Sequence, residues 1–410
     1  MGRMRTCSGG EPEWEIAGVM FDEEPMKRSC GTGAQKRLTE QLPHRPHDHI
    51  IALASRLPFR EGIHTIGLSS TLPCRAAAGK QSIQTPNTYP MNNNFILSIH
   101  RSWVAIGLSA FCAAAFTTTA FGYGPEGHQT VGALADLLIA GTNAERHVRE
   151  ILGPEKLEQA SLWADQVKRS HLPPEMQAFV DRNPRHHQYH YTDIPIQEAA
   201  YRGNSKGADP EDVVRMIRRC ISVLEGHGAN PTNLTKKEAL RLLTHYLGDI
   251  HQPLHVGAAY FDAQDHLANP NQVAGTSETR GGGLIKYRGG LHGYWDSNTV
   301  KLAMSAVHVA TPSAFAARLK QNPPAGWQTP GFFSSWSTRW ATEMLPDAKK
   351  AHSLLTFGPR HMTRGHNPHP EWPATAASDS AYDSWAKGVV KRNLTLGGYR
   401  LAAVLQRIWP

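Results

Sequence analysis

One run of this chain combines three histidines and an aspartate within eleven residues: His245-Tyr246-Leu247-Gly248-Asp249-Ile250-His251-Gln252-Pro253-Leu254-His255. It places His245 and Asp249 four residues apart on a predicted helix, and it adds His255 just after Pro253. Residues at positions i and i+4 share one face of a helix. An imidazole and a carboxylate on one face are ligands that suit a borderline-soft divalent cation such as zinc. The run therefore predicts half of a metal site.

A second pair with the same spacing follows about forty residues later. It is formed by His292 and Asp296 in the stretch His292-Gly293-Tyr294-Trp295-Asp296. Two such half-sites in one chain make a multinuclear metal centre the first hypothesis. Because Pro253 breaks the helix that carries His245, His255 is expected to point elsewhere and to bind a different metal ion.

The start of the chain has the pattern of a leader. Residues 1–90 show no sustained period and are expected to be a disordered or mis-annotated extension. Residues 91–122 resemble a signal peptide, with a positive Arg101, an apolar stretch over 104–116 and a small-residue cleavage site before Tyr123. The alternative is a buried helix over 103–116. The expected domain is 123–410, in a protein that is secreted or periplasmic.

The composition of 123–410 limits what can hold it together. The segment keeps one cysteine, Cys220, so an exported protein would need packing or metal in place of an intramolecular disulfide. The formal net charge of the whole chain is +8, which favours polyanionic partners such as nucleic acid or a membrane surface. We see no transmembrane helix in this segment and expect no stable membrane association.

The hydrophobic period of 123–410 is mostly helical, so the predicted fold is all-α: a mainly helical single domain with a small β-hairpin. The expected helices are 128–140, 210 to about 225, 235–250, one from 292 onward, 334–351 and 380–408. The second of these opens at Pro210, with Asp209 as its N-cap, and runs to about Glu225. For 235–250, Thr235 and Glu238 form a predicted capping box.

Two segments carry turn-forming residues. The Gly-rich stretch 281–287 suggests the short hairpin. Residues 356–378 read as a surface loop with four prolines. Its three histidines, His361, His366 and His369, are expected to be solvated and not to bind metal.

The candidate metal ligands lie at positions spread over 170 residues of sequence. A single histidine on a helix is more often packed or solvated than a ligand, but two His/Asp pairs around Gln252-Pro253-Leu254-His255 are harder to dismiss. In chain order the candidates are His128, Asp165, His190, His245, Asp249, His255, His292 and Asp296.

Six ordered motifs resemble the type I zinc-dependent, single-strand-specific nucleases of fungi, plants and bacteria, which share a helical fold with bacterial zinc phospholipases C. The resemblance covers 123–410. The motifs are Tyr123-Gly124-Pro125-Glu126-Gly127-His128, Ser161-Leu162-Trp163-Ala164-Asp165, His190-Tyr191-Thr192-Asp193, the run from His245 to His255, Leu291-His292 through Trp295-Asp296, and Gly397-Gly398-Tyr399-Arg400-Leu401-Ala402.

This resemblance implies a trinuclear zinc centre. The implied ligands are Asp165, His190 and His245 for the first zinc, His128 with the backbone amine and carbonyl of Tyr123 for the second, and His255, His292 and Asp296 for the third. Asp249 would bridge the first two. The close pair would supply hydroxide, and the third zinc would stabilise the leaving 3′-oxygen, so that products carry 5′-phosphates.

The resemblance also implies the substrate and the residues that contact it. The substrates would be single-stranded DNA, RNA and nucleotides, with additional 3′-nucleotidase activity, and the enzyme is expected to be a monomer. Tyr191 would stack on an unpaired base, and Asp193 would accept hydrogen bonds from it. Lys168 stands where the family often has an arginine that contacts the scissile phosphate. Asp165, Asp249 and Lys168 are therefore the expected catalytic residues.

Two other functions stay open from the sequence. A zinc-dependent phospholipase C would use the same metals on lipid phosphodiesters. An exported zinc-scavenging protein would bind metal without catalysis. The sequence Gln252-Pro253-Leu254-His255 and the pair Tyr191 and Asp193 favour the nuclease, and the complete set of side-chain ligands argues against a storage role.

Overall fold

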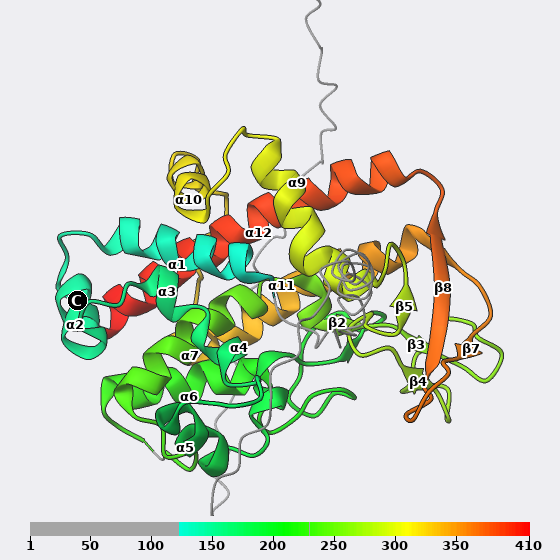
Figure 1. Ribbon diagram of the computed structural model, residues 1–410, viewed down its shortest axis with the longest axis horizontal. Coiled ribbons are helices and arrows are strands. Elements are labelled where there is room, and N and C mark those ends of the chain that lie inside the picture. The colour runs from blue at the N-terminus through cyan, green and yellow to red at the C-terminus, as the bar shows by residue number, and fades with distance from the viewer. Residues whose placement is uncertain (1–122, 229) are drawn as a thin grey trace, which may run out of the picture. The chain divides into compact units, whose positions relative to one another are not determined.

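The computed structural model describes residues 123–228 and 230–410. The expectations for 1–90 and for the leader 91–122 lie outside these residues. The described part is mainly helical with small sheets, which confirms the predicted fold class (Figure 1). Its helices are α1 (Pro125–Ile139), α2 (Asn143–Leu152), α3 (Leu157–Ala160), α4 (Trp163–Gln166), α5 (Pro174–Arg182), α6 (Val213–Glu225), α7 (Lys236–Asp249), α8 (Leu291–Gly293), α9 (Thr299–Ser305), α10 (Pro312–Lys320), α11 (Trp336–Ser353) and α12 (Asp379–Ile408).

Shorter elements connect these helices. The helical turns are η1 (His186–His190), η2 (Pro253–His255), η3 (Tyr294–Asn298) and η4 (Phe333–Ser335). The strands are β1 (Ile194–Pro195), β2 (Gly257–Ala258), β3 (Tyr260–Phe261), β4 (Ser277–Glu278), β5 (Ile285–Lys286), β6 (Leu355–Phe357), β7 (His361–Met362) and β8 (Pro370–Ala376).

The capping box of α7 is confirmed. The Thr235 hydroxyl accepts a hydrogen bond from the Glu238 amide at 3.1 Å, and the Glu238 carboxylate accepts one from the Thr235 amide at 2.8 Å. Both interactions satisfy amides that the first turn of a helix leaves without partners. The start of the ligand-bearing helix is thus set by local sequence.

The predicted N-cap of α6 is wrong. The helix begins at Val213, and its N-cap is Asp212, whose carboxylate accepts from the Arg215 amide. Asp209 instead accepts from the Glu211 amide in a turn that precedes the helix. Either aspartate satisfies a capping rule, so the choice depends on the path of the chain before the helix. The predicted end is correct, with Gly226 in the left-handed conformation.

The core forms where α12 crosses behind α1 and packs on α7 and α9 (Figure 1). Two glycines of α12 allow this close approach. A Cβ at Gly398 would lie 2.6 Å from the Leu134 side chain, and one at Gly397 would lie 3.0 Å from the Leu247 carbonyl oxygen. Leu134 belongs to α1 and Leu247 to α7. The Gly397-Gly398 pair therefore brings both ligand-bearing helices against one long helix.

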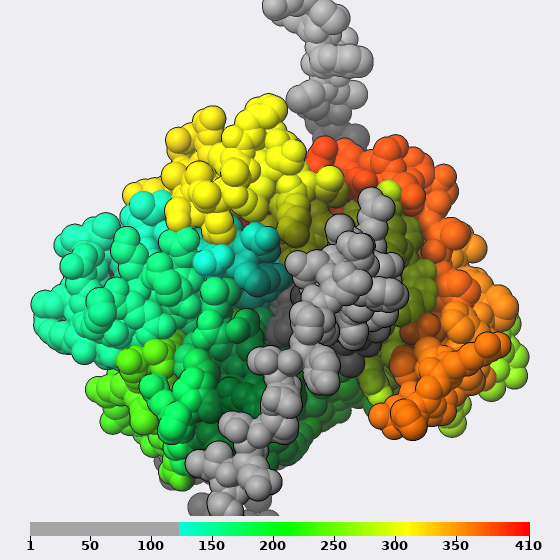
Figure 2. Space-filling model, in the orientation of Figure 1, coloured from blue at the N-terminus to red at the C-terminus, as the bar shows by residue number. Residues whose placement is uncertain are grey.

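The segment of α9 and α10 covers another side of α1. In the space-filling view it lies in yellow beside the cyan N-terminal helix (Figure 2), in agreement with the packing of α10 on α1. Buried Phe315 and Leu319 of α10 contribute to the core. With α12 and α3 on its other sides, α1 is enclosed, and this buries His128 near its start.

The predicted hairpin over 281–287 is wrong in its pairing. β5 of this stretch pairs in parallel with β8, ninety residues further along the chain, while β4 pairs with β3. The predicted loop over 356–378 is also wrong, because it contains β6, β7 and β8. The pairing of β5 with β8 is non-local, which turn-forming residues in one segment cannot reveal, whereas β6 and β7 pair with β8 within the segment that was predicted to be a loop.

Among residues 123–228 and 230–410, no helix combines the length and the apolar character that crossing a membrane requires.

Candidate metal centre

Eight side chains that the sequence singled out meet in the interior, and all are buried. They come from separate elements: α1, α4, η1, α7, η2, α8 and η3. Their ligand atoms form three groups in which all atoms lie within 4.8 Å of one another. The groups are His128, His245 and Asp249; Asp165, His190 and His245; and His255, His292 and Asp296.

Asp249 lies at the centre of these groups. Its Oδ2 is 3.0 Å from His190 Nδ1 and 3.2 Å from His245 Nε2, while its Oδ1 is 3.4 Å from His128 Nε2. Oδ1 also lies 3.5 Å from His255 Nδ1. The two carboxylate oxygens therefore face different groups of imidazoles, which is the arrangement that a bridging ligand requires.

The group around Asp165 has a neighbouring cation. Asp165 Oδ1 is 3.7 Å from His245 Nε2 and 4.0 Å from His190 Nδ1. Lys168, one turn further along the chain, places its ammonium 2.8 Å from the same oxygen. Lys168 thus stands beside a ligand group, with its side chain almost fully buried.

The group around His255 confirms the effect expected of Pro253. α7 ends at Asp249, and Pro253 begins the separate turn η2, which carries His255. His255 Nε2 lies 3.1 Å from His292 Nε2, and His292 Nε2 lies 3.5 Å from Asp296 Oδ2. Asp296 is in the π-helical turn η3; such widened turns are frequent at functional sites.

Backbone carbonyls fix the orientation of three of the imidazoles. The Nδ1 atoms of His245, His255 and His292 lie 2.6, 2.8 and 2.8 Å from the carbonyl oxygens of Ser161, His190 and Gly281. A carbonyl only accepts, so each Nδ1 carries the proton and each Nε2 offers a lone pair to its ligand group.

Two of the imidazoles and one of the carboxylates have charge states that suit metal binding. Burial, followed by the charge of Lys168, lowers the pKa of His190 to about 3, and burial with His255 lowers that of His292 to about 3. Burial alone would raise the pKa of Asp249, but His245 and the neighbouring histidines hold this pKa well below its usual range. At neutral pH these groups are neutral imidazoles and a carboxylate, the ligating forms.

His128 provides the test of whether a metal fits. Both of its ring nitrogens, and Asp249 Oδ1, are buried without a hydrogen-bond partner among the described residues. Leaving such atoms unsatisfied is costly, and a cation between His128 Nε2 and Asp249 Oδ1 would satisfy these two of the three atoms. Room for the ring comes from Gly248, where a Cβ would lie 2.6 Å from His128 Nδ1. The residues therefore fit a metal ion.

Tyr123 is fixed beside this centre. Its side chain is fully buried, and its hydroxyl donates to the His251 carbonyl at 3.1 Å. The next amide, of Gly124, donates to the Asp296 carbonyl at 2.7 Å. Gly127 leaves space for the Tyr123 side chain. The segment that precedes His128 is thus attached to the elements that carry the other ligands.

A cavity of about 340 Å³ opens onto the centre. The ligands His190, His255 and His292 are in its wall, together with the predicted substrate residues Lys168, Tyr191 and Asp193. Five further lining residues were not predicted as site residues: His187, Leu254, Glu278, Arg280 and Gly281. Glu278 and Arg280 come just before the Gly-rich stretch 281–287, for which the sequence predicted only a short hairpin.

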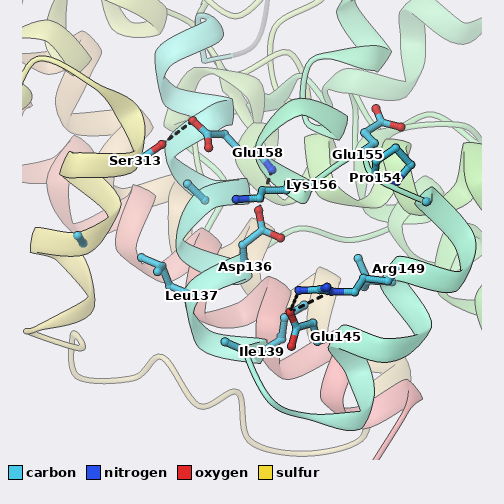
Figure 3. Close-up of a pocket in the computed structure, with 15 residues that line it drawn as sticks. Asp136, Leu137, Ile139, Glu145, Arg149, Pro154, Glu155, Lys156, Glu158 and Ser313 are labelled. Carbon is cyan, nitrogen blue, oxygen red and sulfur yellow. Dashed lines mark hydrogen bonds and ion pairs between the residues drawn. The ribbon is translucent and has the colours of Figure 1, made fainter.

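A second cavity, of about 460 Å³, is lined by residues of α1, α2, α3 and α10 (Figure 3). Its acids are already engaged: the Asp136 carboxylate accepts from the Leu157 and Glu158 amides, and Glu145 pairs with Arg149. None of the three ligand groups contributes a residue to its lining. The chemistry therefore belongs to the smaller cavity.

Two residues of the opening run have structural roles that sequence reasoning missed. His251 turns away from the ligands; its ring nitrogens lie 2.7 Å from the Leu247 carbonyl and 2.9 Å from the Arg400 guanidinium. Gln252 donates to Asp296 Oδ1 at 2.7 Å and so holds a ligand in place. The one sequence feature that indicated a role for His251 and Gln252 was their position between the predicted ligands Asp249 and His255.

Comparison with known proteins agrees with this geometry. The sequence profile described as S1/P1 Nuclease matches residues 123–410. Endonuclease 2 of Arabidopsis thaliana is 24% identical over 306 residues, which cover 70% of this chain and 91% of that protein. Endonuclease 1 of the same plant is 24% identical over 328 residues, covering 75% and 92%. Nuclease S1 of Aspergillus oryzae is 25% identical over 217 residues, covering 50% and 64%.

Proposed function

Because the chain belongs to the S1/P1 nuclease family, whose members are metal-dependent phosphodiesterases, we propose that it is an exported trinuclear-zinc endonuclease. Its substrates are single-stranded DNA and RNA, its products carry 5′-phosphates, and it also has 3′-nucleotidase activity. The observation that carries the proposal is the meeting of three buried ligand groups at one cavity.

The donor set supports zinc as the metal. Five imidazoles and three carboxylates make up the groups. Imidazole nitrogen suits zinc, whereas magnesium and calcium prefer oxygen ligands. Every one of these side chains comes from a single chain, so the site needs no second copy, and we propose that the enzyme acts as a monomer.

The side chains around the centre have separable roles. Zinc ions in such a centre lower the pKa of water and stabilise negative charge on phosphate oxygens. Lys168, paired with Asp165 and lining the cavity, would bind the scissile phosphate. Tyr191 lines the same cavity and offers a ring on which a base can stack.

The cavity also supports the preference for single strands. The ligands are buried, and the space beside them is about 340 Å³, too small for a duplex. A base must leave its stack to reach Tyr191, and an unpaired base does so at lower cost.

The first test is hydrolysis and its dependence on metal. The purified protein should contain three zinc ions per chain and degrade single-stranded DNA or RNA at least about tenfold faster than the matching duplex. A chelator should abolish this activity, and zinc should restore it. Hydrolysis of phosphatidylcholine in place of nucleic acid would establish the phospholipase instead, and zinc binding without either hydrolysis would establish a storage protein.

The second test concerns processing. We propose that export removes the residues before Tyr123, because a free α-amine at Tyr123 would then stand next to the ligand groups to which its segment is attached. Mass spectrometry of the exported protein should give Tyr123 as the first residue. A variant with one alanine retained before Tyr123 should bind one zinc fewer. Equal zinc content in both forms would contradict a ligand role for the amine.

A further inference from the structure

A pair of carboxyl groups lines the cavity beside the metal centre. Asp193 follows η1 and its ligand His190, while Glu278 ends β4, eighty-five residues later in the chain. Both are in the cavity wall with Tyr191. Burial, then the Glu278 carboxylate, raise the pKa of Asp193 well above its ordinary range, and burial also raises the pKa of Glu278.

The backbone around Glu278 holds this acid in place. β4 pairs with β3, so that Glu278 lies opposite Tyr260, whose hydroxyl donates to the Asp193 carbonyl at 2.8 Å. After β4 the chain takes three successive residues with positive φ: Arg280 at 54°, Gly281 at 55° and Gly282 at 84°. This conformation is unfavourable for a residue with a long side chain. The turn directs the Arg280 amide toward the Glu278 carboxylate, and the amide donates a hydrogen bond to this carboxylate.

We propose that Glu278 is a specificity-determining residue: together with Asp193 it reads the Watson–Crick edge of the base that stacks on Tyr191, and it selects guanine over thymine and uracil. The inference rests on the proposed nuclease function and adds the base preference to it. Two acids set against one another in a small cavity offer several acceptors and, when they share a proton, one donor.

The edge of guanine complements this pattern. Guanine presents a carbonyl acceptor followed by two adjacent donor groups, which match one donor and the acceptors of the acid pair. The edges of adenine and cytosine can pair with one donor and one acceptor of the two acids. Thymine and uracil place their single N–H between two carbonyl oxygens, so one carbonyl faces an acid oxygen without a proton between them. The expected order is guanine, then adenine and cytosine, then thymine and uracil.

The experiment uses the purified zinc-loaded protein and four oligothymidine strands that differ in one central base. The ratio kcat/KM for the bond next to that base should be about tenfold or more higher for guanine than for thymine. Glu278→Gln should reduce this ratio to about threefold or less, because the amide keeps the shape but removes an acceptor. Glu278→Asp, which keeps the charge on a shorter side chain, should give an intermediate ratio. Glu150→Gln, a change at an exposed acid on α2, should leave the ratio as it is.

A substrate without a base separates the possible failures. Glu278→Gln should slow the hydrolysis of bis(p-nitrophenyl) phosphate less than it slows cleavage next to guanine, because this substrate has no Watson–Crick edge for Glu278 to contact. If Glu278→Gln slows this substrate as much as the oligonucleotides, Glu278 has a structural role and the inference is wrong. An unchanged guanine preference in Glu278→Gln, or no preference in the wild type, overturns it as well. If the wild type hydrolyses neither kind of substrate, the nuclease function itself is wrong.

Discussion

Asp249→Asn should reduce kcat/KM for single-stranded DNA by more than about a thousandfold, beyond the ten- to hundredfold loss typical for residues that only support a ligand. The carboxylate is fully buried, and its two oxygens face His190 and His245 on one side and His128 on the other. Asparagine keeps the shape but removes the charge and one acceptor. Asp249 is the carboxylate whose oxygens lie within 3.5 Å of imidazoles from all three groups.

Metal content distinguishes this loss from misfolding. Asp249→Asn should bind at least one zinc fewer than the wild type while its circular dichroism spectrum stays helical. Asp181→Asn, at an exposed acid on α5, is the matched control and should leave activity and zinc content unchanged. If Asp249→Asn kept three zinc ions and a tenth of the activity, Asp249 would not be a bridging ligand.

Gly248→Ala should disable the centre without removing any ligand. The added methyl group would lie 2.6 Å from His128 Nδ1 and 3.0 Å from His128 Cε1. The His128 ring has no room to move toward His245, because the two rings are stacked with their centroids 3.6 Å apart. We expect displacement of His128, loss of one zinc, a decrease in kcat/KM of about a hundredfold or more, and about 1–3 kcal/mol lower stability from overpacking.

A second glycine provides the comparison for this variant. Gly293 follows the ligand His292 on α8, but a Cβ there would have no neighbour within 4 Å. Gly293→Ala should therefore retain zinc and activity. Zinc analysis and thermal unfolding of both variants make the test. A Gly248→Ala protein with full zinc content would show that the ring adjusts without cost and that Gly248 is not required for the site.

Local features of the sequence predicted the helices well. The capping box of Thr235 and Glu238, the glycine end of α6 and the break near Pro253 are confirmed, because each depends on residues within a few positions of one another. The N-cap of α6 was wrong by three residues, since Asp209 and Asp212 satisfy the same local rule. Local rules do not choose between two candidates that both fit.

Long-range features were missed or misassigned. The strand over 285–286 pairs with β8 and not within a hairpin, and Glu278 lies in the cavity wall at the end of β4, which pairs with β3. Nothing within four residues of Glu278 signals that it lies near Asp193. Similarly, no prediction assigned a role to His251, whose ring lies 2.9 Å from the guanidinium of Arg400, a residue from the far end of the chain.

The sequence by itself determined that the protein is mainly helical and which eight side chains can ligate metal, because helical spacing and ligand chemistry are properties of neighbouring residues. Only the tertiary structure decided which ligands share a group, that the oxygens of Asp249 face two groups, and that Glu278 joins the cavity. Those facts depend on how closely α1, α7 and α12 pack and on pairings between distant strands. These distances depend on packing between distant parts of the fold, so the sequence of a single segment does not reveal them.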